Sequence, residues 1–364
     1  MPDKLRIGII GANVKGWAGR AHLPALATGV PGAELVAVST TRQESADEAA
    51  KMFGARMAFD HHQPMLDSPE VDAVGIVVKL PHHYQLAKDV IAAGKHIFVE
   101  WPLGTNTVQA EELRNLAATK GLHTAVGLQS HYSAEFRHMA RLIEEGYIGE
   151  VLSVHMSHVM GGAVSRPSNR MWMRDAAAGA NTLSITFAHS IYGLMTALGP
   201  IESFSALVDT RVKEWTDTDT GEKLAVTAAD DVSMIGRLTS GVTLSVHVAS
   251  TARQALSHDL DIHGTEGTLY LETDSSPIQR NGTVMGVQGA SKGFQKMEIP
   301  RDQWVTDSGL EDRPVNVGLL WGAFADSIRR RVDDFHPNFA DAVTHHMLID
   351  AVQRASDTGQ AQVI

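Results

Sequence analysis

The sequence predicts an α/β protein with two domains, a doubly wound parallel sheet followed by an α+β domain with a mostly antiparallel sheet. Through residues 1–128, apolar runs alternate with helical patterns, which is typical of βαβ units. From residue 151 onward, strand-like runs follow one another with glycine turn signals between them, which favours antiparallel pairing. The 364 residues are enough for two domains of the usual ~100–200 residues each.

The first domain is expected to span residues 1–128. Its strands are short apolar runs, and Val74–Val78 is almost continuously apolar, as in a strand that is covered on both faces. The predicted strands are Arg6–Ile10, Glu34–Ser39, Ala73–Val78, His96–Glu100 and Thr124–Leu128. The predicted helices are Ala18–Thr28, Glu44–Phe53, Tyr84–Ala93 and Thr107–Lys120.

The second domain is expected to span residues 129–340, and residues 341–364 are expected to form a C-terminal helix that packs back on the first domain. Residues 284–312 contain several glycines and are interpreted as an irregular surface excursion. The predicted strands are Val151–His158, Glu202–Asp209, Asp231–Leu238, Thr243–Ala249, Leu260–His263 and Thr268–Glu272. The predicted helices are Ser133–Glu145, Leu183–Leu198, Leu319–Arg331 and Ala340–Thr358.

Composition excludes several classes of protein. The chain has no cysteine, which rules out disulfides, a thiolate nucleophile and a cysteine metal site, and fits a reducing cytoplasm. The net charge of −11, with basic residues scattered apart from Arg329–Arg331, argues against a nucleic-acid surface. The N-terminus lacks the pattern of a signal peptide, and no apolar run reaches the ~20 residues of a membrane span. We therefore expect a cytoplasmic protein without nucleic-acid or membrane partners.

The 18 histidines raise the question of a metal site. Three pairs are adjacent in sequence: His61-His62, His82-His83 and His345-His346. Adjacent side chains point to different sides of a strand or helix, so these pairs are poor chelators. No metal site is predicted.

A glycine-rich loop follows the first strand, in the stretch IGIIGANVKGWAGRAH at residues 7–22. Gly8 and Gly11 permit a tight turn, and Gly16 or Gly19 would let backbone approach a pyrophosphate at the N-terminus of the next helix, whose N–H groups are free. The spacing is looser than GxGxxG, and a turn without a ligand is the alternative. The context of strand, loop and helix favours a dinucleotide site, with candidate contacts at Gly8, Gly11, Asn13, Gly16 and Trp17.

The end of the second strand indicates which dinucleotide is bound. Sites that prefer NAD place Asp or Glu there for the ribose 2′-hydroxyl. This chain has hydroxyls and a guanidinium instead, at Ser39, Thr40, Thr41 and Arg42. These groups suit a 2′-phosphate, so the sequence favours NADP over NAD.

Several motifs together resemble the Gfo/Idh/MocA family of oxidoreductases. They are the glycine loop, VVKLPHHY at 77–84, AGKHIFVEWPLG at 93–104, FAHSIYGL at 187–194 and DIHGTEGTLYLE at 261–272. The resemblance covers nearly the whole chain. It implies a Rossmann domain, a C-terminal domain with an open, largely antiparallel sheet, and a homodimer or homotetramer formed through that sheet. It also implies cofactor contacts at Lys79, Leu80, His83, Glu100, Trp101, Pro102 and Gln129.

The family's reactive residues are only partly present. Where the family has Glu-Lys-Pro, with the lysine beside the nicotinamide, this chain has Trp101. The family histidine corresponds to His189, and the aspartate four residues earlier is replaced by Ile185. An indole offers only an N–H donor and isoleucine offers nothing, so the removal of a proton falls to His189. Tyr192, His83 and His131 are candidate helpers.

Trp101 has three interpretations: it fills space, it clamps the proline turn, or it forms a flat wall beside the nicotinamide, which we favour. The Glu-Trp-Pro variant resembles a narrower branch of the family, that of the fungal galactose-pathway repressor. That branch implies a cofactor-binding fold used as a regulatory sensor.

Substrate contacts are expected in the polar loop 165–181 and at the end of another strand. Arginine suits a carboxylate or vicinal hydroxyls, and tryptophan stacks on a sugar or an aromatic ring. The alternative is an ordinary solvated loop. The candidates are Arg166, Asn169, Trp172, His131, Tyr132 and His189.

Three functions follow. The first is an NAD(P)-dependent oxidoreductase that transfers a hydride to or from a sugar, polyol or similar hydroxylated small molecule, with His189, Trp101 and Tyr192 as catalytic candidates. The second is a sensor that binds the dinucleotide without turnover. The third is a lyase or epimerase that passes through a transient ketone.

Overall fold

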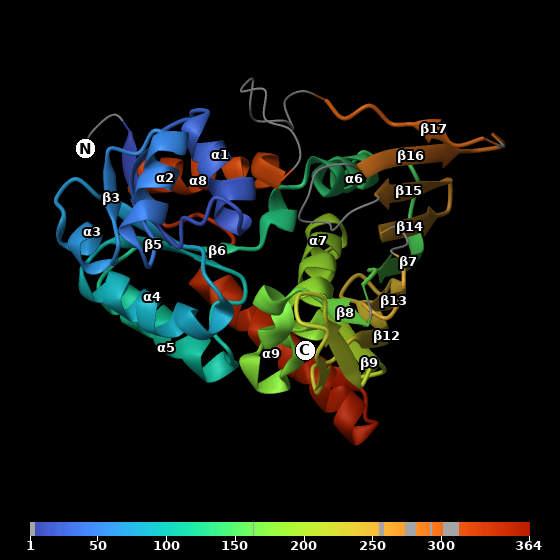
Figure 1. Ribbon diagram of the computed structural model, residues 1–364. Helices are drawn as coiled ribbons and strands as arrows, with labels where there is room; N and C mark the ends of the chain where they lie inside the picture. The colour runs from blue at the N-terminus through green and yellow to red at the C-terminus, as the bar shows by residue number, and fades with distance from the viewer. Residues whose placement is uncertain (1–3, 163, 255–257, 274–281, 292, 301–312) are drawn as a thin grey trace. The chain divides into compact units, whose positions relative to one another are not determined.

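The computed structural model describes residues 4–162, 164–254, 258–273, 282–291, 293–300 and 313–364 (Figure 1). It consists of two compact units. The first unit holds the described residues of 1–132 and 305–346, and the second holds those of 133–304 and 347–364.

The first unit is built on a sheet of six parallel strands in the order β3-β2-β1-β4-β5-β6. The order reverses at β1, from which the chain proceeds outward in both directions, so the expected doubly wound parallel sheet is confirmed. The strands are β1 (Leu5–Ile10), β2 (Ala33–Ser39), β3 (Met57–Phe59), β4 (Ala73–Ile76), β5 (His96–Glu100) and β6 (Thr124–Gly127).

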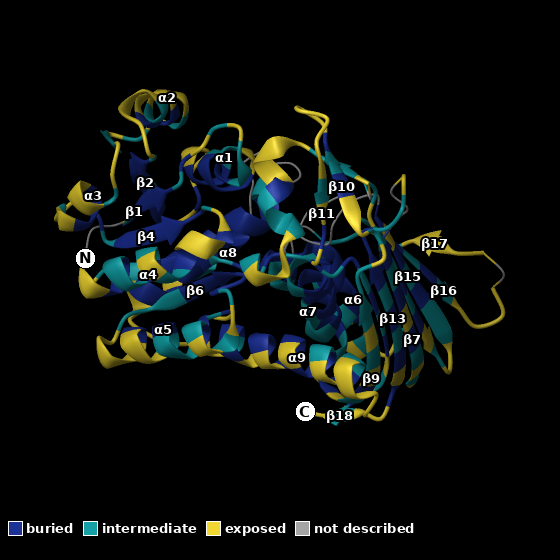
Figure 2. Ribbon diagram, turned by 60° about the horizontal axis from the view of Figure 1, so that its bottom comes forward, coloured by how far each residue is buried: buried dark blue, intermediate teal, exposed yellow. Residues whose placement is uncertain are grey.

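Helices cover both faces of this sheet: α1, α2 and α8 lie on one side, and α4 and α5 on the other (Figure 1). Strands β1 and β4 are almost wholly buried between them (Figure 2). This explains the continuous apolar runs of the sequence. The helices are α1 (Leu23–Ala27), α2 (Gln43–Phe53), α3 (Gln63–Asp67), α4 (His83–Ala92), α5 (Thr107–Thr119) and α8 (Arg313–Arg330), with a π-helical turn at Ala18–His22 and 3-10 turns at Leu80–His82 and Gln129–Tyr132.

Helix α8 packs in the first unit, although the sequence analysis assigned its residues to the second domain. Trp321 of α8 is fully buried and stacks on Phe98 of β5, with ring centroids 4.5 Å apart. Its indole also lies against Phe324, so one apolar helix face completes the core over the sheet. The chain therefore returns to the first unit after it has formed most strands of the second unit.

The second unit is built on a nine-stranded sheet in the order β17-β16-β15-β14-β7-β13-β12-β9-β18. Every pairing is antiparallel except that of β7 with β13, which confirms a mostly antiparallel sheet. The strands are β7 (Val151–Val159), β9 (Ile201–Asp209), β12 (Asp231–Leu238), β13 (Thr243–Ala249), β14 (His258–Gly264), β15 (Gly267–Thr273), β16 (Gly282–Gln288), β17 (Gln295–Lys296) and β18 (Gln362–Val363).

Helices α6 (Ala134–Glu144) and α7 (Ala188–Leu198) pack on one face of this sheet. Phe136 of α6 lies against His258 of β14, and Ser190 of α7 bonds His158 of β7. A small three-stranded sheet, β11-β10-β8, stands apart from the large one. Its strands are β8 (Ser165–Arg166), β10 (Glu214–Asp217) and β11 (Lys223–Ala225).

Three expectations about elements need correction. Residues 282–288, which overlap the predicted irregular excursion, form β16 and pair along their whole length with β15; residues 301–312 of that excursion lie outside the described residues. The predicted helix Leu183–Leu198 begins as a π-helix, Thr182–Phe187, before α7. The C-terminal helix α9 (Phe339–Thr358) begins in the first unit, but residues 347–364 belong to the second, where β18 pairs with β9.

The described residues contain neither a membrane-spanning helix nor a metal-binding cluster. Their helices include none with both the length and the apolar character needed to cross a bilayer. In the same part of the chain, His, Asp and Glu side chains do not gather in threes as a metal ion would require.

Candidate functional site

The glycine loop follows β1, at the carboxyl end of the first sheet. The amides of Gly11 and Ala12 donate to the carbonyl of Ser39, at the end of β2, over 2.9 and 3.1 Å. Gly11 has a φ of +86°, and a β-carbon there would collide with the backbone of Val77, just past β4. Glycine at this position therefore lets three strand ends meet, which is the place where open α/β sheets bind ligands.

The loop beyond Gly11 is organised by Asn13. Its carbonyl accepts from the amides of Gly16 and Gly19, at 3.0 and 3.1 Å, and its side-chain oxygen accepts from the amide of Lys15. A β-carbon on Gly19 would collide with the backbone of Val14. The sequence analysis expected free amides here; those of Gly16 and Gly19 are instead used to close the loop.

Two buried polar atoms near these strand ends have no partner among the described residues: Nε1 of Trp17, a donor, and Oε1 of Gln129, an acceptor. An unpaired buried group of this kind typically costs about 1–3 kcal/mol. Both residues were predicted to contact a dinucleotide. A ligand with an acceptor for the indole and a donor for the amide would satisfy both, and a nicotinamide dinucleotide carries groups of both kinds in its phosphates, hydroxyls and carboxamide.

Glu100, at the end of β5, is held in a buried network. Nε2 of Gln129 donates to both its oxygens, at 2.8 and 3.1 Å, and Nε2 of His22 lies 2.8 Å from Oε1. The indole N–H of Trp321 donates to Nδ1 of His22 over 3.1 Å. Because Nδ1 accepts, the proton of the neutral imidazole is on Nε2 and points to the carboxylate. The network fixes Glu100 and orients Gln129.

The indole of Trp101 is enclosed within the first unit. It is 5% exposed, and its ring lies 4.9 Å from that of His345 and 4.6 Å from that of His346, centroid to centroid. Both histidines are on α9. Burial, with His345 adding to it, lowers the pKa of His346 to about 3, so that ring is neutral near pH 7. The Trp101–Pro102 peptide bond is cis.

His83 has a structural position rather than that of a base. Its Nδ1 lies 2.8 Å from the carbonyl of Pro102, and its Nε2 lies 3.1 Å from that of Val78, so the ring joins the segments that follow β4 and β5. Burial lowers its pKa despite these two acceptors, so the neutral ring donates to one carbonyl only. The contact with the Pro102 carbonyl is the shorter of the two, so we assign the ring proton to Nδ1, which faces it. Its neighbour Leu80 is buried, and Lys79 is exposed.

The residues at the end of β2 and after it differ in whether their side chains are exposed and able to bind a ligand. Ser39 is buried, and Oγ1 of Thr40 donates to the carbonyl of Arg42 and contacts Ser45. Thr41 and Arg42 are exposed, and Arg42 precedes the first turn of α2. Among the described residues no ion pair involves the Arg42 guanidinium, so it is available to an added phosphate.

His189 is in the first turn of α7, within the second unit, and is buried. Tyr192 lies three residues further along and therefore on the same side of the helix. Ile185 is in the π-helix before α7, which Asn181 and Ser184 begin with reciprocal side-chain caps. Next to His189, Ser190 donates to the carbonyl of Thr186 and therefore accepts from Nδ1 of His158, at 2.9 Å. These contacts tie α7 to β7.

The candidate substrate residues have different surroundings. The Arg166 guanidinium lies 4.9 Å from the ring centre of Trp215 and donates to the carbonyl of Gly162. Trp172 is half-buried in the 3-10 helix Ser168–Arg174, and Asn169 is exposed. In the first unit, the Tyr132 hydroxyl donates to the carbonyl of His336, and the His131 ring lies edge-on to that of Tyr132. Arg166 and Tyr132 thus have structural partners.

Four residues around this site were missed from the sequence: His22, Trp321, His345 and His346. The two adjacent histidines were considered only as metal ligands. Their packing on an indole more than 240 positions earlier leaves no signal in a local pattern. His22 and Trp321 are likewise far apart in sequence.

Two family models match this chain. Residues 5–128 match the oxidoreductase family with an NAD-binding Rossmann fold. Residues 135–273 match the C-terminal domain of Gal80p.

The chain is 24% identical to the galactose/lactose metabolism regulatory protein GAL80 of Saccharomyces cerevisiae, over 98% of this chain and 93% of that protein. A super-repressor mutant of Gal80p from the same organism has a similar structure, with a TM-score of 0.86 and 22% identity over 99% of this chain and 98% of that one. Levoglucosan dehydrogenase in complex with NADH and L-sorbose matches with a TM-score of 0.83 and 22% identity, over 100% of this chain and 99% of that one.

Proposed function

The chain belongs to the Gfo/Idh/MocA family of oxidoreductases, in the branch with a Gal80p-type C-terminal domain, and from this premise we propose that it is an NAD(P)-dependent oxidoreductase. The reaction proposed is hydride transfer to or from a sugar, polyol or similar hydroxylated small molecule.

One observation carries the proposal. The segment matched by the NAD-binding model, residues 5–128, ends next to Gln129, and this amide and Trp17 of the glycine loop hold two of the buried polar atoms that have no partner among the described residues. Buried polar groups are normally paired, so atoms left open at the carboxyl edge of a doubly wound sheet support a missing ligand. We propose Gly8, Gly11, Asn13, Gly16, Trp17, Glu100, Trp101, Pro102 and Gln129 as its surroundings.

NADP is the proposed form of the cofactor. Residues 39–43, at the end of β2 and just after it, include no acidic side chain for a ribose 2′-hydroxyl, and the exposed guanidinium of Arg42 suits a 2′-phosphate. Thr41 adds a hydroxyl, whereas the Oγ1 of Thr40 is already engaged with Ser45 and Arg42.

When bound, the nicotinamide would supply the hydride donor or acceptor. The chain must then move the proton of the substrate hydroxyl, and His189 is proposed for this because a neutral imidazole accepts a proton near pH 7. Tyr192 is proposed to assist it. The contacts of Ser190 with Thr186 and His158 hold the helix turn that carries His189, and so restrict the position of its ring. Trp172 and Asn169 remain proposed substrate contacts.

The test combines binding with turnover. Purified protein is titrated with NADPH and NADH and then assayed for cofactor oxidation or reduction on a panel of sugars, polyols and aromatic alcohols. We expect saturable binding and turnover of at least one substrate class, with turnover lost in His189→Ala and binding retained. Binding without turnover on the whole panel would overturn the catalytic part.

A second candidate is a dinucleotide-dependent regulator that does not turn over. The observation in its favour is the packing of Trp101, which replaces a proton-handling amine by a buried indole in contact with His345 and His346. The match of residues 135–273 to the Gal80p C-terminal domain points the same way. Cofactor turnover that disappears in His189→Ala would exclude it. Activity without added cofactor and without net oxidation would instead identify a lyase or epimerase.

We also propose that two or four copies of the chain associate through the second sheet. Leu207 of β9 and Ile235 of β12 are 62% and 71% exposed on the sheet face opposite α6 and α7. Small side chains surround them, because Ile235 is paired with Ser205 on one side and Ser245 on the other. A flat face of this composition is suited to a second copy.

A further inference from the structure

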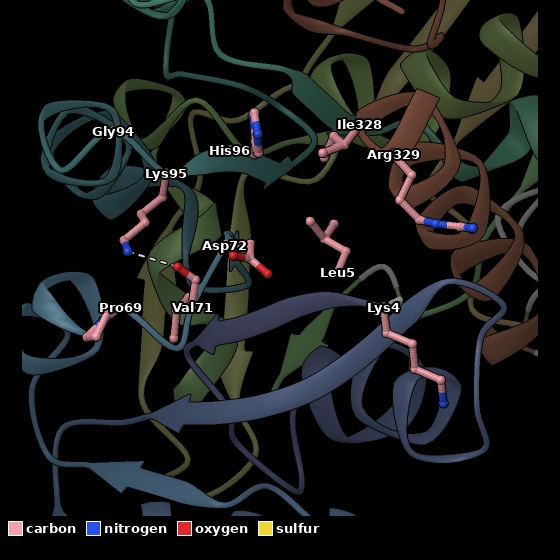
Figure 3. Close-up of a pocket in the computed structure, with 10 residues that line it drawn as sticks. All are labelled: Lys4, Leu5, Pro69, Val71, Asp72, Gly94, Lys95, His96, Ile328 and Arg329. Carbon is pink, nitrogen blue, oxygen red and sulfur yellow. Dashed lines mark hydrogen bonds between the residues drawn. The ribbon is translucent and has the colours of Figure 1, made fainter. Parts of the chain in front are cut away.

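A cavity of about 280 Å³ lies at the edge of the first sheet opposite to the glycine loop (Figure 3). It is formed where β1, β4 and β5 begin, and by the last turn of α8. Its apolar lining includes Leu5, Val71 and Ile328, all buried. The proposed dinucleotide site is at the carboxyl ends of the same strands, so the cavity is separate from it. Its volume is just below the ~300–1,000 Å³ of typical small-molecule pockets, so only a small ligand fits.

Three cationic side chains line this cavity: Lys4, Lys95 and Arg329. In the part of the chain that the structure describes, none of the three forms an ion pair. By contrast, the neighbouring Arg330 forms ion pairs with both Asp326 and Asp334. The cavity therefore has an excess of positive charge.

The acidic residue in the lining, Asp72, does not balance this excess because Arg6 already occupies it. The backbone amide and Nε of Arg6 donate to Oδ2 of Asp72, both at 2.9 Å, and Nη2 donates to Oδ1 at 2.7 Å. These contacts lower the pKa of Asp72 against the effect of its partial burial, so the pair is ionised and neutral overall.

Lys95 is the most constrained of the three cations. Its Nζ donates to the carbonyls of Ser68 and Val71, both at 2.8 Å, and Figure 3 draws the contact with Val71. An ammonium has three N–H donors, so one remains, and two carbonyls do not neutralise its charge. Burial lowers the pKa of Lys95, against the opposing effect of the Asp72 and Asp67 carboxylates.

Cationic side chains near the C-terminus of a helix also compensate the helix dipole, and this is a simpler explanation for the cations in the cavity lining. Arg329 is in the last turn of α8, and Lys95 follows the end of α4. The dipole explains why each helix end has a cation. It does not explain why three cations line one cavity in which the one carboxylate of the lining is already paired.

We propose that this cavity binds a small dicarboxylate. Figure 3 shows Lys95 on one side of Leu5 and Asp72, and Arg329 and Lys4 on the other. A ligand that reaches both sides needs a negative group at each end and an apolar middle over Leu5. We therefore expect inorganic phosphate and a monocarboxylate, which lack two separated negative groups, to bind more weakly.

The test is a calorimetric titration of the full-length protein with succinate, against potassium chloride at matched ionic strength, with acetate and inorganic phosphate as comparison ligands. We expect saturable binding of succinate that is tighter than that of either comparison ligand. Arg329→Gln and Lys95→Met should each weaken it about five- to tenfold, by loss of one charge contact. Lys51→Gln removes a cation from the last turn of α2, outside the cavity, and should leave the affinity unchanged.

Because Lys95 also holds two carbonyls, Arg329→Gln, at an exposed position, decides the outcome if the lysine variant fails to fold. No saturable heat with succinate, tighter binding of phosphate, or equal losses in Arg329→Gln and Lys51→Gln would each overturn the proposal. The affinity for nicotinamide nucleotides should be the same in Arg329→Gln as in the wild type, which keeps this result independent of the proposed function.

Discussion

The ring of Trp101 lies 4.6 Å from the ring of His346, centroid to centroid, in the interior of the first unit. Of the three interpretations of this tryptophan, space filling has a direct structural basis, because α9 contributes two imidazoles to its surroundings. A wall beside the nicotinamide remains a prediction. The two roles are compatible, since an indole has two faces and an edge.

Truncation of Trp101 should destabilise the protein. We expect Trp101→Ala to lower the free energy of unfolding by about 3 kcal/mol, because a large buried ring is lost. Trp101→Phe keeps a ring between the histidines and should lose less than half of this. Urea denaturation followed by circular dichroism measures both. A loss below 1 kcal/mol in the alanine variant would contradict the packing role.

Trp17→Phe should weaken cofactor binding without lowering the stability of the protein. The substitution removes the unpartnered Nε1 donor and keeps most of the ring. We expect the stability of the ligand-free protein to stay the same or rise by up to about 1 kcal/mol, because an unsatisfied buried donor disappears. NADPH affinity should fall about five- to tenfold. Thermal unfolding and calorimetry check the two effects; an unchanged affinity would remove Nε1 from the site.

Arg42→Ala tests the choice of cofactor. Loss of a guanidinium that contacts a 2′-phosphate should weaken NADPH binding about tenfold and leave NADH binding within about twofold. Lys51→Ala, in the last turn of α2, serves as the control for the loss of one positive charge. Equal effects of Arg42→Ala on both nucleotides would argue against the NADP preference.

Acid should destabilise the second unit through a buried pair of histidines. His158 and His258 are cross-strand neighbours with ring centroids 4.9 Å apart. Burial lowers the pKa of His158 to about 4 and that of His258 well below its ordinary value. The unfolded chain then binds more protons than the folded protein below pH 6.5. For His158 the stability is complete above pH 6.5 and is lost as the pH falls from 6.5 to about 4.

Between pH 7.5 and pH 5 this linkage amounts to about 2 kcal/mol for His158 alone. Urea titrations at the two pH values measure it. His158→Gln retains a donor for Ser190 without titrating, and should therefore lose less stability on acidification than the wild type. An equal loss in the two proteins would assign acid sensitivity to other groups.

Ile235→Asp tests the outer face of the second sheet as a contact between copies. A carboxylate in the middle of an apolar contact is costly, so we expect the variant to be smaller in solution than the wild type by light scattering. Met52→Asp, which places the same charge on exposed helix α2, is the control. A wild type that is already monomeric would refute the proposed association.

Local sequence patterns predicted most elements of the fold but not how the chain passes between units. Periodicity identified the helix at 319–331, yet it cannot show which sheet covers Trp321, and Phe98 lies more than 220 residues away. Residues 282–288 looked irregular because Gly282 and Gly286 interrupt the apolar pattern. Gly286 nevertheless fits between Met297 and Tyr147, where a β-carbon would be crowded, so β16 forms around it.

In the candidate site, too, local sequence patterns predicted some features and missed others. The glycine loop was located from spacing, and Gly11 has the role that its type predicts. The use of the Gly16 and Gly19 amides by Asn13 depends on the loop's own closure, which spacing does not encode. The roles of His189, Tyr192, Asn169 and Trp172 stay predictions. The same holds for Arg166 and Tyr132, whose contacts with Trp215 and His336 could not be read from residue type because these partners are remote in sequence.

Titration calorimetry with NADPH and NADH on the wild-type protein tests the central claim most directly. The account predicts saturable heat with both nucleotides, tighter binding of NADPH, and weaker binding of both in Trp17→Phe and Gln129→Leu. Absence of heat with either nucleotide, in a protein shown to be folded by circular dichroism, would contradict it.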